Sequence, residues 1–183
     1  HLGYDVITGA GPGIMEAGNK GAENDSDFGL NILLPFEQTA NEYIRNSEPS
    51  INYDRFNLVS PGILRTPDER FNDLKDFPFS PNYLIIGDTR IHYIDEGPKD
   101  GQIIYLLHGE PTWSYLFRNI IPTLVKNGYR VIAPDMVGFG KSDKYISTDD
   151  YSHQMHVDKM TQLIIELDLN NITAHFHDWG GPV

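Results

Sequence analysis

A carboxylate stands at a predicted strand-to-turn junction near the end of the sequence, in the run His177-Asp178-Trp179-Gly180-Gly181. The β-branched and aromatic residues at 171–176 predict a strand just before it, and the two glycines permit a tight turn after it. A carboxylate held on such a turn can attack an alkyl carbon and form an ester, which water then cleaves. The structural alternative is an aspartate that caps the following helix. The neighbouring tryptophan favours chemistry, because its indole N–H seeks a partner when buried.

Two earlier loops also follow predicted strands. The run His108-Gly109-Glu110-Pro111-Thr112-Trp113 comes after the apolar segment 103–107 and can offer a backbone N–H to a developing oxyanion. The run from Pro134 to Asp143 has two glycines and two aspartates and follows a strand at 131–133. For the individual residues of this second loop we expect a structural role. Three such loops at strand ends together indicate a functional site much more specifically than any one of them alone.

Alternating strands and helices predict how these loops are positioned. A hairpin is expected at 83–86 and 90–95 around Gly87-Asp88. Further strands are expected at 103–107, 131–133 and 171–176, and helices at 114–126 and 151–167. This order predicts a parallel sheet with helices on both faces.

The first part of the sequence has a different pattern. A strand at 4–8, a glycine loop at 9–13, a helix at 14–22 and a strand at 30–34 predict a partial Rossmann-like βαβ fragment. Gly11 and Gly13 are candidate phosphate-binding residues, although the third glycine of the dinucleotide fingerprint would fall at Ile14. The segment 46–67 is irregular and predicts a junction. We therefore expect two domains, at 1–58 and 59–183.

Composition excludes several classes of function. The 183 residues carry 14 basic and 26 acidic side chains, a net charge of -12, which argues against nucleic-acid and anionic-membrane partners. The absence of cysteine excludes disulfides, thiolate catalysis and cysteine-based metal sites. No apolar run is long enough for a membrane helix, and no signal peptide is apparent, so a cytoplasmic protein is expected. The sequence begins with His1, which suggests a partial reading frame, a processed product or a cut chain.

The three loops together resemble those of the haloalkane dehalogenases of the α/β-hydrolase family. The resemblance is carried by His108 to Leu116, Pro134 to Asp143 and His177 to Gly181. Leu64 to Phe71 and Phe77 to Tyr83 are similar to the start of the branch that acts on small haloalkanes. The resemblance to haloalkane dehalogenases covers residues 63–183. It implies an incomplete α/β-hydrolase sheet, which is the N-terminal half of that fold without its cap domain.

The resemblance implies roles for three residues. Asp178 would displace halide from a small haloalkane and form an alkyl ester, and Trp179 would bind the departing halide through its indole N–H. The backbone N–H groups of Glu110 and Trp179 would form the oxyanion hole. No cofactor or metal is implied, and the partners would be the haloalkane and the halide ion.

The resemblance also implies what this chain lacks. The histidine base, its acidic partner and a second halide-binding residue would follow Val183, so we expect no turnover by the chain alone. His175 and His177 precede the nucleophile and are expected to be strand or turn residues. Phe176 stands where the family usually has a small or β-branched residue, and it could strain the turn.

Three alternatives remain open at this stage. An epoxide hydrolase shares the fold and the aspartate turn, although the run Glu110-Pro111-Thr112-Trp113 favours a dehalogenase. Residues 1–58 resemble the lysine-decarboxylase-like nucleoside-monophosphate phosphoribohydrolases, without their Pro-Gly-Gly-x-Gly-Thr-x-x-Glu segment, so a nucleotide-binding module is the second alternative. The resemblance is carried by Thr8 to Ala17, Lys20 to Ala22, Gly29 to Ile32 and Leu34 to Gln38. The third is an inactive chain whose last strand is an unpaired, aggregation-prone edge.

Overall fold

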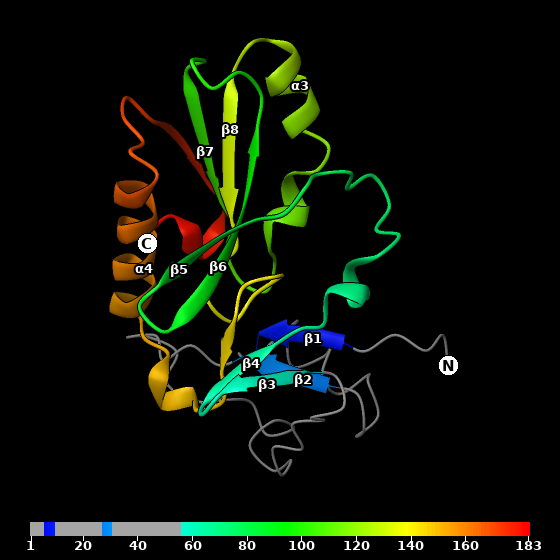
Figure 1. Cartoon of the computed structure of the whole chain (residues 1–183), viewed down its shortest axis with the longest axis vertical. Coiled ribbons are helices and arrows are strands. Elements are labelled where there is room, and N and C mark those ends of the chain that lie inside the picture. Colours follow the sequence, from blue (N-terminus) through cyan, green and yellow to red (C-terminus); the bar gives the residue numbers. More distant parts are fainter. Residues whose placement is uncertain (1–5, 10–26, 31–55) are drawn as a thin grey trace.

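The computed structural model describes residues 6–9, 27–30 and 56–183 (Figure 1). Its main element is a five-stranded sheet with the strand order β10-β7-β8-β6-β5. The strands are β5 (Asn82–Ile86), β6 (Thr89–Glu96), β7 (Ile103–Leu107), β8 (Arg130–Pro134) and β10 (Thr173–Phe176).

The sheet is mixed, which corrects the prediction of a parallel sheet. Strands β10, β7 and β8 run parallel, whereas β6 is antiparallel to both β8 and β5. The cause is the β5–β6 hairpin, since a two-residue connection can join only antiparallel strands. The hairpin itself is confirmed, with Gly87 at a φ of 61° in its turn.

One predicted helix is confirmed and the other is divided. Helix α4 (His153–Glu166) begins where the Ser152 side chain accepts a hydrogen bond from the Met155 N–H. The segment predicted as a helix at 114–126 forms a 3-10 turn, η3 (Ser114–Phe117), followed by the short helix α3 (Ile121–Lys126). Pro122 explains the division, because proline suits the first turn of a helix but cannot donate a hydrogen bond within a continuous one.

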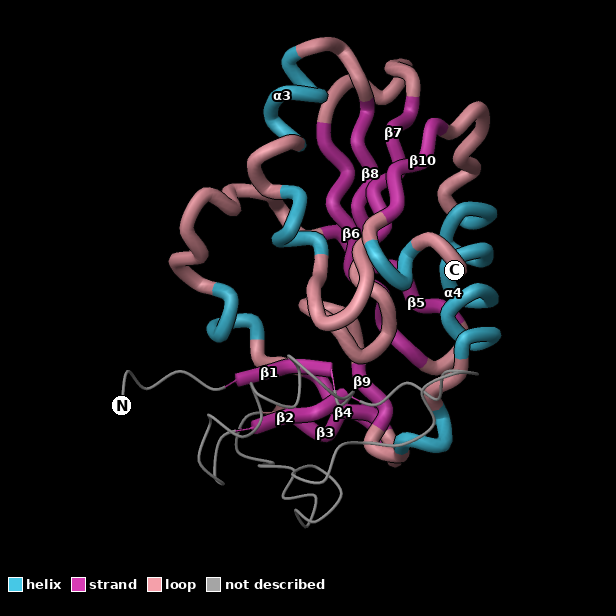
Figure 2. The backbone as a smooth tube through the Cα atoms, turned by 180° about the vertical axis from the view of Figure 1, so that it is seen from behind, coloured by secondary structure: helices cyan, strands magenta, loops and turns pink. Residues whose placement is uncertain are grey.

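The helices cover opposite faces of the sheet, as predicted (Figure 2). Met160 and Leu163 of α4 pack in one buried cluster with Ile91, Tyr105 and Ile132. On the other face Phe117 and Ile121 pack with Ile94, Leu106 and Val131. Alternate residues of β6, β7 and β8 therefore face different cores, which explains why Ile103–Leu107 is apolar throughout.

Strand β10 is the edge of the described sheet. It pairs with β7 on one side, and all four of its residues are exposed. Among the described residues, the strand leading to Asp178 is therefore an edge strand, as predicted.

Two smaller sheets accompany the main sheet. The strands β3 (Asn57–Ser60), β4 (Ile63–Arg65) and β9 (Lys144–Tyr145) form an antiparallel sheet. The predicted linker at 46–67 thus ends in ordered strands, since β4 gains partners from the distant segment 144–145. The strands β1 (Val6–Gly9) and β2 (Asp27–Leu30) pair in parallel.

Most of the other features predicted for residues 1–58 lie outside the described residues. β2 begins earlier than the strand predicted at 30–34, while the predicted helix at 14–22 lies outside the described residues. Gly11 and Gly13, the candidate phosphate-binding residues, also lie outside them. The Rossmann-like fragment therefore stays a prediction. None of the helices in the described ranges has the length and apolar character needed to cross a membrane.

Candidate active site

Asp178 stands on a sharp turn at the end of β10. The His177 N–H donates a hydrogen bond to the Leu107 carbonyl at 3.0 Å and so continues the pairing of β10 with β7. Asp178 then has a φ of 51°, a left-handed conformation that a side chain other than glycine seldom adopts. Asp178 is also the first residue of a 3-10 turn, η5 (Asp178–Gly180). Asp178 is exposed at this bend.

Two glycines let this turn lie against the end of β7. A Cβ on Gly180 would stand 2.6 Å from the Leu107 carbonyl oxygen. A Cβ on Gly109 would stand 2.6 Å from Asp178 Oδ1 and 2.5 Å from the Trp179 nitrogen. All three distances are shorter than a carbon atom can occupy, so the contact between the two loops requires glycine at both positions.

The structure brings Glu110 and Asp178 together. The Glu110 backbone N–H donates to Asp178 Oδ1 at 3.2 Å across 68 residues of sequence. The cis peptide bond between Glu110 and Pro111 follows this N–H. One carboxylate oxygen is therefore oriented by the backbone of the neighbouring loop.

Trp179 adjoins this contact. Its side chain is partly buried and packs against the apolar cluster on the α4 face. Gly109 leaves room for the Trp179 main chain, whose nitrogen lies close to this glycine.

Other residues considered from the sequence have different surroundings. The His175 ring contacts Phe117 edge to face, with centroids 6.1 Å apart. His177 is the residue that precedes η5. Phe176 is 48% exposed, so its ring is not forced into the interior beneath the turn.

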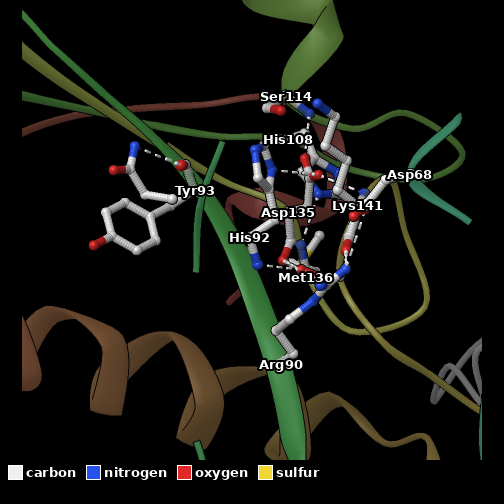
Figure 3. Close-up of polar contacts among 12 residues, drawn as sticks. Asp68, Arg90, His92, Tyr93, His108, Ser114, Asp135, Met136 and Lys141 are labelled. Carbon is white, nitrogen blue, oxygen red and sulfur yellow. Dashed lines mark hydrogen bonds and ion pairs between the residues drawn. The ribbon is translucent and has the colours of Figure 1, made fainter. Parts of the chain in front are cut away.

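A fully buried carboxylate, Asp135, lies in the loop that follows β8 (Figure 3). Its Oδ1 accepts from the Ser114 N–H at 2.8 Å, and its Oδ2 accepts from the Lys141 N–H at 2.9 Å. His92 Nδ1 lies 2.8 Å from the same Oδ2. Burial by itself would raise the pKa of Asp135, but the His92 imidazole and the backbone donor hold that pKa at about 2. Asp135 is therefore a charged structural group, as expected for its loop.

His108 is buried and neutral. Its Nδ1–H donates to the Gly109 carbonyl at 3.0 Å, and its Nε2 accepts from the Met136 N–H at 3.0 Å. These two partners fix one tautomer of the neutral ring. Burial lowers the pKa of His108, which agrees with that assignment.

The sequence did not single out His92. This residue lies within β6, away from the glycine-rich loops, and its fully buried ring meets Asp135 across 43 residues. A histidine inside a strand carries no local signal of such a pair. In the described part of the chain no three His, Cys, Asp or Glu side chains gather as they would around a metal ion.

Comparison with known proteins finds similarity over the second part of the chain. A family model described as the alpha/beta hydrolase fold matches residues 102–183. The haloalkane dehalogenase of Psychrobacter cryohalolentis is 54% identical over 126 residues, which are 66% of this chain and 42% of that protein. The haloalkane dehalogenase of Mycolicibacterium paratuberculosis is 52% identical with the same coverage.

Solved structures give a similar result. A tetrameric haloalkane dehalogenase from Paraglaciecola agarilytica has a TM-score of 0.63 and 51% identity, over 65% of this chain and 42% of that chain. An epoxide hydrolase from Vigna radiata has a TM-score of 0.52 and 28% identity, over 56% of this chain and 32% of that one. The chain thus spans less than half the length of these relatives. These similarities do not support the predicted lysine-decarboxylase-like fragment at residues 1–58, which stays a prediction.

Proposed function

We propose that this chain, which carries part of an α/β-hydrolase fold, is the nucleophile-bearing portion of a haloalkane dehalogenase-like hydrolase. Its substrate would be a small haloalkane, and Asp178 would be the nucleophile. The observation that carries the proposal is the hydrogen bond from the Glu110 N–H to Asp178 Oδ1 at 3.2 Å. It holds an exposed carboxylate, on a turn with positive φ, in one orientation.

The proposed first step is a substitution at carbon. A carboxylate oxygen of Asp178 forms a bond to the carbon that bears the halogen, and the carbon–halogen bond breaks with its electron pair leaving on the halide ion. The products are an alkyl ester of Asp178 and a free halide. Trp179, the next residue along the chain, would stabilise the departing anion by donating its indole N–H to it.

The second step needs water and a base. Water would add to the ester carbonyl, lose a proton to the base, and release the alcohol and the Asp178 carboxylate. The N–H groups of Glu110 and Trp179 would stabilise the oxyanion that forms. Three described histidines lie near the turn: His108 is engaged by two hydrogen bonds, His175 contacts Phe117, and His177 directly precedes the nucleophile, where a turn residue rather than the base is expected. We therefore propose that the 183-residue chain by itself forms the ester and does not hydrolyse it.

Mass spectrometry tests this proposal. Incubation with n-butyl bromide should add one butyl group to the intact chain, and peptide mapping should place it on Asp178. The Asp178→Asn variant, which keeps the shape of the side chain, should stay unmodified. A folded chain without any adduct would rule out Asp178 as a nucleophile.

An epoxide hydrolase is the second candidate, because solved epoxide hydrolases share the fold over more than half of this chain. The identity of 28% to that enzyme, against 51% to the dehalogenase structure, favours the dehalogenase. Butylene oxide distinguishes the two, since ring opening by Asp178 retains the epoxide oxygen. Its adduct would be heavier than the butyl ester by one oxygen atom. Faster reaction with the epoxide than with the bromide would reverse the order of the two candidates.

A further inference from the structure

We infer that Asp135 is a positioning residue which, with its neighbour Met136, holds both ends of the loop that presents the Glu110 N–H to Asp178. The inference rests on the proposed function, because it explains how that N–H is kept in place. It concerns the loop from His108 to Ser114, called here the donor loop. Asp135 touches neither the Asp178 carboxylate nor the substrate carbon in this proposal.

The first end of the donor loop is held through His108. The Met136 N–H donates to His108 Nε2, and His108 Nδ1–H donates to the Gly109 carbonyl. The ring is fully buried, so water does not compete for either bond. The peptide group between Gly109 and Glu110 is therefore held, through the His108 ring, by the loop that follows β8.

The second end is held directly by Asp135. The Ser114 N–H donates to Asp135 Oδ1 at 2.8 Å, and both residues are fully buried. A hydrogen bond to a buried, charged carboxylate is stronger than one between neutral groups. Ser114, where the donor loop ends and η3 begins, is thus fixed to Asp135, the residue before Met136.

Asp135 is itself held against movement. Its Oδ2 meets His92 Nδ1 and the Lys141 N–H, and its own N–H donates to the His92 carbonyl at 2.9 Å. A Cβ on Gly140 would stand 2.2 Å from Oδ2, so only glycine lets this part of the loop close around the carboxylate. The same group thus joins β6, the donor loop and its own loop (Figure 3).

Between its two fixed ends the donor loop is short and internally bonded. The Thr112 N–H and hydroxyl both donate to the Gly109 carbonyl, at 2.9 and 2.8 Å. The loop is thus expected to move as a unit, and releasing Ser114 should displace Glu110. Small displacements of an orienting group can slow a reaction by orders of magnitude.

The test compares three variants of the full 183-residue chain. Asp135→Ala removes the acceptor for Ser114, whereas Asp135→Asn keeps an acceptor oxygen in its place. Asp143→Asn is the matched control, because Asp143 is a buried carboxylate of the same loop whose partners are Arg65 and the Arg90 N–H rather than the donor loop. Two quantities are measured on folded protein: the rate of butyl-ester formation, and the position of the Glu110 amide resonance by heteronuclear NMR.

Asp135→Ala should slow ester formation about tenfold or more and shift the Glu110 amide resonance. Asp135→Asn should restore most of the rate, to within about threefold of the original chain, and Asp143→Asn should change neither quantity. If Asp135→Ala does not fold, the inference requires Asp135→Asn to form the butyl ester more slowly than Asp143→Asn does.

Unchanged ester formation and an unmoved Glu110 amide in the Asp135 variants would overturn the inference. So would an equal loss in Asp143→Asn, because the effect would then be one of general stability. If the original chain forms no ester, the proposed function fails instead. In that case the position of the Glu110 amide resonance in the Asp135 variants shows by itself whether Asp135 positions the donor loop.

Discussion

Two aspartates of this chain show how surroundings assign different roles to one residue type. Asp135 is fully buried and is held by a histidine and two backbone N–H groups, with a pKa of about 2. Asp178 is exposed, and Glu110 donates one backbone hydrogen bond to it. A carboxylate saturated with buried donors is a poor nucleophile, whereas an exposed one that accepts a single hydrogen bond from the described residues can attack carbon. The exposed aspartate is therefore the better candidate for chemistry.

A single methyl group at Gly109 should disturb this arrangement. In Gly109→Ala the new Cβ would collide with Asp178 Oδ1 and with the Trp179 nitrogen, so the turn must shift. We expect ester formation to slow about tenfold or more, measured as the rate of butyl addition by mass spectrometry.

Gly181→Ala is the control for that change. Gly181 has an ordinary helical φ of -70°, and a Cβ there would come no closer than 3.3 Å to another heavy atom, the Asp178 carbonyl oxygen. Its rate should stay within about twofold of the original. Equal rates in the two variants would mean that the close approach at Gly109 is not needed.

At the scale of elements, the open strand β10 is the most exposed part of the main sheet. Its backbone has one strand partner in the described chain, and Phe176 is 48% exposed. Unpaired strand edges with apolar side chains promote association between copies of a chain. The same strand leads into the turn that carries Asp178, so association there would also obstruct the site.

A charge on β10 should reduce such association. We expect Phe176→Lys to lower the concentration-dependent self-association of the chain, as measured by sedimentation velocity, because a lysine at a sheet edge disfavours strand pairing between molecules. Ile165→Lys adds the same charge on α4, where Ile165 is 62% exposed, and should have a smaller effect. Equal effects of the two substitutions would show that net charge, rather than the strand edge, controls the self-association.

At the scale of the whole molecule, His156 links stability to pH. It is 2% exposed, and neither ring nitrogen has a hydrogen-bond partner among the described residues. Burial lowers the pKa of His156 from 6.5 to about 4. The unfolded chain therefore binds a proton at a higher pH than the folded chain does.

The free energy of unfolding should fall on acidification for this reason. The contribution of His156 is fully present above pH 6.5 and is lost as the pH falls toward 4, a change of about 3 kcal/mol. Urea unfolding between these pH values measures it. His156→Leu should flatten the dependence, while His153→Gln, a change one helical turn earlier, should alter it much less, because burial is a larger cause of the lowered pKa of His156 than the charge of His153. An unchanged slope in His156→Leu would show that another group titrates.

The sequence by itself determined the elements whose signals are local. The apolar run 103–107, the turn at Gly87 and the helical spacing of 151–167 each depend on neighbouring residues, and the structure confirms the elements predicted there. The aspartate turn and the loop at Glu110 were likewise identified from short runs of sequence.

Only the tertiary structure decided which distant groups meet. The contact of Glu110 with Asp178 spans 68 residues, and that of His92 with Asp135 spans 43. Such contacts depend on strand order, on the hairpin that makes the sheet mixed, and on glycines that allow close approach. Local propensity does not encode these features, because they arise when separate strands pack side by side in one sheet.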